Sequence, residues 1–375
     1  MKLLYVVAED WYFYSHRLPM MRGAVAAGFD VTLVTNVTAH KGQIEALGVR
    51  VIPWSLKRES LNPFTALKQV FALVKIYRDE KPDLIHHVAL KPILFGSIAA
   101  VIAKMPRVLN AFAGLGIIFH GDTGLARTIR PLLTLLFRLL LKCENFWLLF
   151  QNRDDLAKLA KLDLVVQSRV AVIRGSGVET ERYTVTDLLE TPPFICAYAG
   201  RMIDSKGLPT MYEAFDILKT KAPHIKLWLC GKPDSGNPGT WDEKRLRDWC
   251  AANPNIEWKG HRDMADIWPH THLALQPSWG GEGLPKALLE AGACARAMVA
   301  SDVSGCREVV QPGVNGILVP AEDAQALAEA ILQIASDLEL CATMGQESRR
   351  IVEEDFSADY VTEQTAALYT RILKS

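Results

Sequence analysis

The sequence has no C-x-x-C pair, and its seven cysteines are scattered singly between positions 143 and 341. An odd, unspaced set argues against a disulfide framework and fits a reducing compartment. The histidine pairs, His86 with His87 and His270 with His272, have no cysteine or aspartate at metal-ligand spacing, so no metal site is expected. The chain has 42 basic and 42 acidic residues, and this balance gives no indication of nucleic-acid binding.

The sequence also lacks an uninterrupted apolar run long enough to span a membrane. Its N-terminus has no basic region or cleavage site of a signal peptide, so we expect a cytoplasmic location. The most apolar stretch, Pro131–Lys142, is interrupted by Arg138 and preceded by Arg127 and Arg130. Two interpretations stay open for it: a core helix of the first domain, or a helix lying peripherally on the anionic cytoplasmic face of the inner membrane.

Apolar β-branched runs alternate with helical patterns along most of the chain, and this alternation predicts parallel sheets with helices on both faces. At 375 residues the chain is too long for one ordinary core, so two domains are expected. Strands are predicted in the first half at Leu3–Val7, Asp30–Thr35, Arg50–Trp54, Asp83–Val88, Arg107–Phe112, Phe146–Gln151 and Val170–Arg174. In the second half they are predicted at Phe194–Ala199, Lys226–Cys230, Asn255–Trp258, Leu273–Gln276, Met298–Ser301 and Gly316–Val319.

The polar, aperiodic segment that ends in Thr191-Pro192-Pro193 divides the two halves. The predicted organisation is an N-terminal domain (1–183), a linker (184–193), a C-terminal domain (194–355) and a final helix (356–375) that packs back on the first domain. The fold class is α/β, with two Rossmann-like, doubly wound parallel-sheet domains facing a central cleft. Ligands of such sheets bind at the carboxyl ends of the strands.

The stretch Glu282–Glu290 places two carboxylates eight residues apart around Gly283, Leu284 and Pro285. The run from Lys286 reads as a helix. If that helix starts near Glu282, both carboxylates project from roughly the same side, and the helix start favours an anion. Such a pair can grip the hydroxyls of a sugar and of a ribose. Two solvated glutamates on an ordinary helix explain the spacing equally well when it is taken alone.

Cations and glycines follow the first predicted strands of the second half. Gly200 permits close backbone approach, Arg201 can form two parallel hydrogen bonds to a phosphate, and Lys206 adds a point charge. Together they can neutralise a diphosphate leaving group without a metal ion, and no convincing Asp-x-Asp run suggests one. Gly231 opens a glycine-rich loop that can approach a base or ribose through its backbone; a surface turn is as good an explanation.

Candidates for the acceptor site follow strands of the first half. His16 and Arg17 lie in a segment, Glu9–Pro19, that reads as a loop before a helix, and they can meet a phosphate or an acceptor hydroxyl. Lys91 can contact an anionic acceptor. His86 and His87 are more often packed or solvated at such positions than catalytic. No G-x-G-x-x-G motif is present, so a dinucleotide site is not expected.

The order Gly200-Arg201…Lys206-Gly207, Glu282-Gly283-Leu284-Pro285…Glu290 and Ser301-Asp302…Glu308 resembles the retaining GT-B glycosyltransferases of family 4. The first half is similar, through Ser60–Phe64, Leu90–Pro92 and Gly114–Gly116, to bacterial enzymes that extend undecaprenyl-diphosphate-linked sugars, including N-acetylhexosaminyl transferases. Many relatives carry a histidine after the fifth strand of the first domain. This sequence has Ala113–Gly116 there, so no catalytic histidine is carried over.

The resemblance implies a retaining transferase that moves a hexose or N-acetylhexosamine from a UDP-sugar to a lipid-linked saccharide. It implies that the domain of residues 1–183 binds the acceptor and that the domain of residues 194–355 binds the nucleotide-sugar. Arg201 and Lys206 would hold the donor diphosphate, Glu290 the ribose and Glu282 the sugar, while the backbone of Gly283–Pro285 contacts sugar and phosphate. No cofactor or metal is implied. The alternatives are a sugar-nucleotide epimerase or hydrolase of the same fold, which would release UDP without an acceptor, and a non-catalytic nucleotide-sugar sensor.

Overall fold

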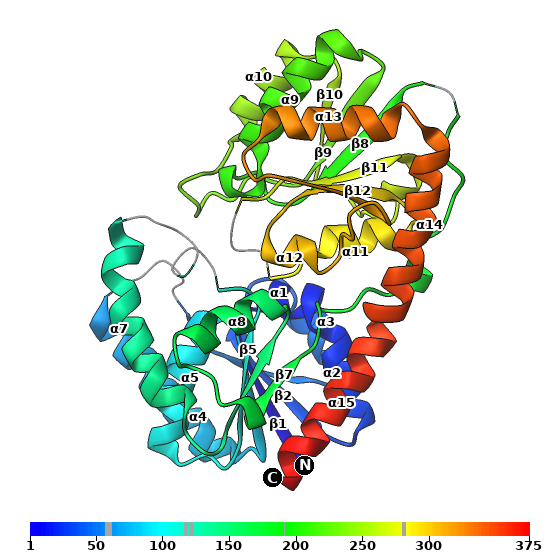
Figure 1. Cartoon of the computed structure of the whole chain (residues 1–375). Helices are drawn as coiled ribbons and strands as arrows, with labels where there is room; N and C mark the ends of the chain where they lie inside the picture. The colour runs from blue at the N-terminus through cyan, green and yellow to red at the C-terminus, as the bar shows by residue number, and fades with distance from the viewer. Residues whose placement is uncertain (57–61, 116–118, 120–123, 191, 280–282) are drawn as a thin grey trace. The chain divides into compact units, whose positions relative to one another are not determined.

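A computed structural model of the chain describes residues 1–56, 62–115, 119, 124–190, 192–279 and 283–375. The chain divides into two compact units (Figure 1). Unit 1 comprises Met1–Gly177 together with Ala358–Ser375, and unit 2 comprises Val178–Ser357. The segment that the sequence marks as a linker, 184–193, is grouped with unit 2.

The described part of unit 1 contains a seven-stranded sheet in the order β3-β2-β1-β4-β5-β6-β7, and every adjacent pair is parallel. The central strands are apolar and buried along their length, as expected for strands with helices on both faces. The strands are β1 (Lys2–Glu9), β2 (Asp30–Asn36), β3 (Arg50–Pro53), β4 (Leu84–Val88), β5 (Val108–Phe112), β6 (Phe146–Phe150) and β7 (Val170–Val172).

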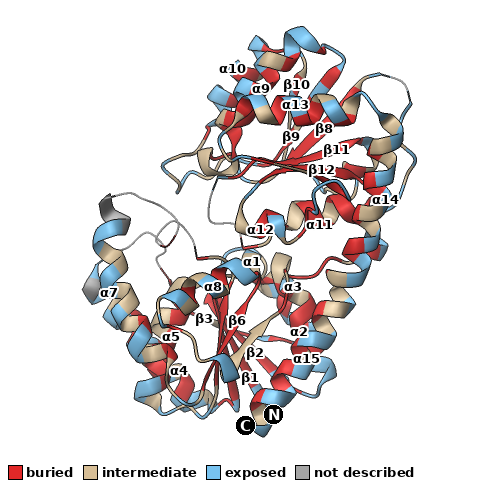
Figure 2. Ribbon diagram, in the orientation of Figure 1, coloured by how far each residue is buried: buried red, intermediate tan, exposed pale blue. Residues whose placement is uncertain are grey.

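Helices cover both faces of this sheet (Figure 2). One face packs against α1 (Asp10–His16), α2 (Leu18–Ala26), α3 (Lys41–Glu45) and α15 (Ala358–Lys374). The other face packs against α4 (Pro63–Glu80), α5 (Leu90–Ala103), α7 (Gly124–Leu141) and α8 (Arg153–Lys161). Asn62 and Asn152 cap α4 and α8 by accepting hydrogen bonds from backbone N–H groups.

The last helix, α15, belongs to unit 1 although the residues before it belong to unit 2. It packs beside α2, where the Thr362 hydroxyl donates a hydrogen bond to the Pro19 carbonyl at 2.9 Å. Its Tyr369 is fully buried and hydrogen-bonds with the Tyr5 hydroxyl and with Nδ1 of His86. The unit 1 core is therefore built from the two ends of the chain.

The described part of unit 2 contains a six-stranded parallel sheet in the order β10-β9-β8-β11-β12-β13. Its strands are β8 (Phe194–Ala199), β9 (Ile225–Cys230), β10 (Ile256–Gly260), β11 (Leu273–Gln276), β12 (Ala297–Ser301) and β13 (Gly316–Val319). The helices are α9 (Leu208–Lys221), α10 (Glu243–Ala252), α11 (Lys286–Ala293), α12 (Ser304–Arg307), α13 (Ala324–Ala335) and α14 (Leu338–Asp355).

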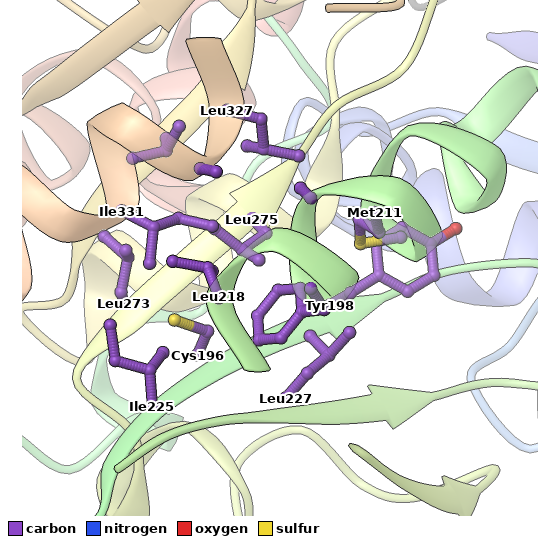
Figure 3. Close-up of a cluster of buried hydrophobic side chains, with 14 of the residues drawn as sticks. Cys196, Tyr198, Met211, Leu218, Ile225, Leu227, Leu273, Leu275, Leu327 and Ile331 are labelled. Carbon is purple, nitrogen blue, oxygen red and sulfur yellow. The ribbon is translucent and has the colours of Figure 1, made fainter. Parts of the chain in front are cut away.

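Figure 3 shows the larger core of unit 2, where side chains from three strands meet two helices. Cys196 and Tyr198 of β8 lie with residues of β9 and β11 against α9 and α13. The opposite face of the sheet packs against α11, α12 and α14. Asp242, Asp323 and Asp337 each cap a helix by accepting from a backbone N–H.

These elements confirm the predicted α/β class and two Rossmann-like domains, and each predicted strand is present within three residues of its predicted ends. One local prediction is wrong, and one condition set by the sequence is not met. The segment after β1 is helix α1 rather than a loop, because Asp10 begins a helix immediately at the end of the strand. Helix α11 begins at Lys286, as the sequence predicts, and not near Glu282; Pro285 is its extended N-cap, so Gly283 to Pro285 precede the helix.

Candidate functional site

The order of strands in unit 2 reverses between β8 and β11, and the crevice at such a reversal is where doubly wound sheets bind ligands. β9 lies on one side of β8 and β11 on the other. The segments that leave the carboxyl ends of these three strands are residues 200–207, 231–240 and 277–279. They carry the cations and glycines singled out in the sequence.

The first of these segments is held by the end of its own strand. The Tyr198 hydroxyl donates a hydrogen bond of 2.8 Å to the Arg201 carbonyl, and the Gly200 N–H donates to the Cys230 carbonyl at 2.9 Å. A Cβ on Gly200 would sit 2.5 Å from that hydroxyl. The glycine is therefore required by Tyr198, which sequence reasoning missed.

Gly207 and Gly231 serve close packing between the segments. Gly207 has φ +83°, and a Cβ there would overlap the Pro277 carbonyl. A Cβ on Gly231 would overlap the Gly200 carbonyl. The Gly231 backbone is also bonded within the protein: its N–H donates to Gly260 at 2.7 Å, and its carbonyl accepts from the Trp258 indole at 3.0 Å. Close packing against Gly200 therefore accounts for the glycine at position 231, and no ligand is needed to explain it.

The two predicted cations lie at opposite ends of the first segment. Arg201 is 48% exposed in its side chain and forms an ion pair of 2.7 Å with Asp234. Lys206 is half-buried and ends η3, a short 3-10 helix (Asp204–Lys206) that precedes α9. An exposed ion pair contributes little stability, so Arg201 can exchange its carboxylate partner for a phosphate at small cost.

Asp204 joins the segments, and the sequence analysis did not identify it. Its carboxylate accepts from the Trp241 indole at 2.7 Å, and its carbonyl accepts from the Trp279 indole at 2.8 Å. The Trp279 N–H also donates to the Ser205 carbonyl at 3.2 Å. The segment that carries Lys206 is thereby attached to the one that leads from β11 toward α11. Trp241 and Trp279 are far from Asp204 in sequence, so no local pattern could have indicated this role.

Glu290 lies in the second turn of α11, with its side chain 14% exposed and its Oε1 3.6 Å from Lys286 Nζ. Burial raises the pKa of its carboxyl, and the charge of Lys286 and a hydrogen bond from Tyr183 act in the opposite direction. Glu282 lies outside the described residues. Residues 283–285 are not helical and α11 starts at Lys286, so the condition under which the sequence would align the two glutamates, a helix start near Glu282, is not met.

In unit 1, His16 and Arg17 have different environments. His16 is half-buried, stacked on Tyr12 at a ring distance of 4.6 Å, with its Nδ1 2.6 Å from the Ser15 hydroxyl. Arg17 is 1% exposed and donates to the Tyr12 hydroxyl and to the Met20 sulfur. The expectation that Arg17 meets a ligand is therefore wrong, since its guanidinium is enclosed in the protein.

Lys91 is the second residue of α5, half-buried, just after the end of β4. Ala89, the N-cap of that helix, has φ +74°, a conformation that alanine adopts only under strain. The neighbouring His86 and His87 are fully buried. His87 hydrogen-bonds to Tyr77 and Asn110, and burial lowers its pKa to about 4, so both histidines are packed residues of the core.

Asp10 carries a buried carboxylate and is not among the candidate residues predicted from the sequence. It accepts hydrogen bonds from the backbone N–H groups of Thr38, Ala39 and His40, and from the Thr38 hydroxyl. Burial alone would raise its pKa, but these hydrogen bonds outweigh it and the pKa is lowered. Asp10 thus fixes the loop after β2 to the end of β1.

Two family models match the chain, one in each half. Residues 2–152 match the model described as "Glycosyl transferase 4-like", and residues 193–337 match "Glycosyl transferases group 1". The chain belongs to the family 4 glycosyltransferases. The two matches together span most of both sheets, and the second includes every segment at the carboxyl ends of β8, β9 and β11.

Curated relatives are similar to this glycosyltransferase over nearly their whole length. The N,N'-diacetylbacillosaminyl-diphospho-undecaprenol alpha-1,3-N-acetylgalactosaminyltransferase of Campylobacter jejuni is 26% identical, with 96% of each chain covered. The capsular polysaccharide biosynthesis glycosyltransferase CapM of Staphylococcus aureus is 24% identical, with 96% of each covered. The structure of HepE from Anabaena in complex with UDP and glucose superposes with a TM-score of 0.79 at 18% identity, covering 99% of this chain and 100% of that one. The fold is therefore GT-B.

The described residues of the glycosyltransferase contain no group of three or more His, Cys, Asp or Glu side chains arranged to hold a metal ion. None of the helices in the described ranges is both long enough and apolar enough to cross a membrane.

Proposed function

We propose that the glycosyltransferase moves a hexose or N-acetylhexosamine from a UDP-sugar to an undecaprenyl-diphosphate-linked saccharide, in the assembly of a surface polysaccharide or glycan. The names of the Campylobacter jejuni and Staphylococcus aureus relatives support the class of acceptor and the pathway. The UDP and glucose bound by the Anabaena protein support the class of donor.

One observation carries the donor assignment: Asp204 and Ser205 fasten the segment of Arg201 and Lys206 to Trp279, which lies just before the Glu282–Glu290 stretch. Two cations are thus held at the strand reversal, where a diphosphate would be bound. Arg201 would contact two phosphate oxygens and Lys206 would add a compact positive charge. Their charge would stabilise the departing UDP and make a metal ion unnecessary.

The remaining donor contacts follow from the α11 region. Glu290 would accept hydrogen bonds from the ribose hydroxyls, Glu282 would contact the transferred sugar, and the backbone of Gly283, Leu284 and Pro285 would contact sugar and phosphate. Gly200 and Gly231 would lie at the floor of the site, where their lack of side chains lets the segments pack closely. His16 and Lys91 of unit 1 would contact the acceptor.

The proposed reaction retains the anomeric configuration. The acceptor hydroxyl oxygen bonds to the anomeric carbon on the same face from which UDP departs, and the bond from that carbon to the β-phosphate oxygen breaks. The departing phosphate oxygen takes the proton of the acceptor hydroxyl, so no protein base is required. The role of Arg201 and Lys206 is to bind the negative charge that develops on the phosphate.

The test is a transfer assay with UDP-sugars and an undecaprenyl-diphosphate-linked saccharide, with the product linkage determined by NMR. We expect an α-linked product from an α-linked donor, undiminished by EDTA. Arg201→Ala and Lys206→Ala should each reduce kcat by about 10²–10³-fold. Arg247→Ala is the matched control, because Arg247 makes only an exposed ion pair with Glu243 on α10.

Four outcomes would contradict the proposal or a part of it. A β-linked product excludes retention, and near-normal transfer by both cation variants excludes the diphosphate role. Release of UDP without any acceptor identifies an epimerase or hydrolase instead. Binding of UDP-sugar with no turnover in the presence of lipid extract identifies a sensor.

A further inference from the structure

Two helices of unit 1 expose large apolar side chains at regular spacing. On α4 these are Phe64, Leu67 and Phe71, and Phe64 is 82% exposed. On α7 they are Leu132, Leu135 and Leu139, of which Leu139 is 67% exposed. Steps of three and four residues place each set along one side of its helix. The opposite sides are buried, through Val70 and Val74 on α4 and through Phe137 and Leu141 on α7, so each helix has an inner and an outer apolar stripe.

The outer stripes differ from the exposed apolar residues elsewhere in the described part of the chain. Val25, Leu47, Tyr212 and Val314 occur singly on different elements, and Val101 with Ile102 and Val185 with Leu189 form only pairs, which is normal for a protein surface. The six residues of α4 and α7 instead form two sets, on helices that cover the same face of the unit 1 sheet with α5 between them (Figure 2).

The charges beside these stripes have one sign. α7 carries Arg127, Arg130 and Arg138 and contains no Asp or Glu. α5 also contains no acidic residue. On α4, Lys68 and Lys75 lie on the exposed side, and the acidic residues are confined to its last turn. The whole chain has a net charge of zero, so this is a local excess of positive charge.

We propose that the outer faces of α4 and α7 form a docking surface for an anionic phospholipid bilayer. The surface consists of Phe64, Leu67, Phe71, Leu132, Leu135, Leu139 and the adjoining Lys68, Lys75, Arg127 and Arg138. Apolar side chains that enter the headgroup region and cations that contact lipid phosphates supply the two signals that stable peripheral binding needs. A second copy of the same surface fits it poorly, because cations would face cations.

The two interpretations of Pro131–Lys142 that the sequence left open are then compatible: the helix fills the core on one side and offers a lipid-binding side on the other. The docking surface does not depend on the proposed donor or acceptor, because vesicle binding is measured without either. A failure here would therefore leave the proposed reaction untouched, and failure of the transfer assay would leave the surface untouched.

The test is flotation of the full chain with vesicles of phosphatidylglycerol and phosphatidylcholine, compared with phosphatidylcholine alone. We expect binding to the anionic vesicles, weakened in 1 M salt, where the screening length falls to about 3 Å. The triple variant Leu132→Gln, Leu135→Gln, Leu139→Gln should lose at least about tenfold in vesicle affinity. Lys68→Gln and Lys75→Gln should each lose about fivefold.

The matched control is Val25→Gln with Leu47→Gln, which removes two exposed apolar residues from α2 and from the turn after α3 and should leave vesicle binding unchanged. Unchanged melting temperatures will show that all variants are folded. Absence of wild-type binding, or equal binding by the triple variant, overturns the proposal. So does a dimer, detected by light scattering, that the triple variant converts to a monomer while vesicles bind neither form.

Discussion

The segments that follow the first strand of each sheet occupy equivalent positions, yet their charged side chains differ in how far they are exposed. After β1, Asp10 and Arg17 are both enclosed, at 0% and 1% exposure. After β8, Arg201 stays half exposed and Lys206 half-buried at the strand reversal. The first segment encloses its charged side chains, and the second leaves its two cations partly exposed.

Both segments nevertheless depend on an aspartate. Asp10 accepts the backbone N–H groups of the loop after β2, and Asp204 accepts the Trp241 indole while its carbonyl accepts that of Trp279. The comparison separates two uses of charge: buried or partly buried acids organise the edge of a sheet, and the cations next to them stay partly exposed. Four substitutions test this separation.

Gly207→Ala should have the largest effect on folding. A side chain at Gly207 meets the Pro277 carbonyl, and φ +83° adds conformational strain. We expect a loss of about 4 kcal/mol or more in the free energy of unfolding, measured by denaturant titration. Gly313→Ala is the control, because Gly313 has a similar φ of +77° but no atom within 4 Å of the place its added methyl group would occupy. That control should cost only about 1–2 kcal/mol, and equal losses would show that close packing of the segments contributes nothing.

Asp10→Asn should destabilise unit 1 by about 3 kcal/mol at neutral pH, because an amide cannot accept all the hydrogen bonds that the carboxylate accepts. Asp248→Asn, in an exposed pair on α10, should change stability by less than about 0.5 kcal/mol.

The effect of Asp10 should depend on pH. Its pKa is lower in the folded protein than the unfolded value of about 3.9, so its stabilisation is present above that value and is lost as the pH falls through the folded pKa. The difference in melting temperature between wild type and Asp10→Asn should therefore narrow below about pH 4. A difference that stays constant with pH would exclude the carboxylate as its source.

Glu290→Gln should raise the KM for the donor about tenfold, the loss expected when a charged acceptor of ribose hydroxyls becomes neutral. It should not destabilise the fold. Burial raises the pKa of Glu290, so the wild type loses stability as the pH rises from the unfolded value of about 4.3 through the folded pKa, whereas the amide does not titrate. Glu329→Gln on the exposed side of α13 is the control. An unchanged KM for the donor would show that Glu290 does not contact the donor.

Tyr198→Phe should have the smallest effect. It removes the hydrogen bond to the Arg201 carbonyl and leaves Arg201 itself in place. We expect a loss of about 1 kcal/mol in stability and a rise of a few fold in donor KM. Tyr212→Phe, at an exposed tyrosine of α9, should change neither. A full loss of transfer in Tyr198→Phe would assign the tyrosine a direct part in the reaction.

The sequence predicts the strands and the class of fold well, because buried parallel strands such as Leu84–Val88 are short apolar runs between turn residues. It also singles out Arg201, Lys206 and Glu290 as candidates for the donor site, because each belongs to a short motif within one segment of the chain; their contact with a donor is a proposal. All of these features depend on residues that lie close together in the sequence.

The contacts that position those residues are not local. Asp204 with Trp279 and Asp10 with Thr38 join segments that only the folded sheet brings together. The helical segment α1 also escapes prediction, since Trp11, Tyr12, Phe13 and Tyr14 read equally as an aromatic loop. Burial of Arg17 is a tertiary effect, and an isolated Arg in sequence is ordinarily exposed.

The return of α15 to unit 1 has a consequence for the order of synthesis. Tyr369 is part of the same buried cluster as Tyr5, so unit 1, whose synthesis begins first, needs residues that are made only after unit 2. At about 5–20 residues per second, the ribosome takes roughly ten to forty seconds to make the intervening unit 2. All residues of unit 2 are available before α15 is made, so unit 2 can fold on the ribosome. Unit 1 cannot complete its core until α15 has been synthesised. Removal of the last few turns of α15 would therefore destabilise unit 1, the unit that contains the N-terminus.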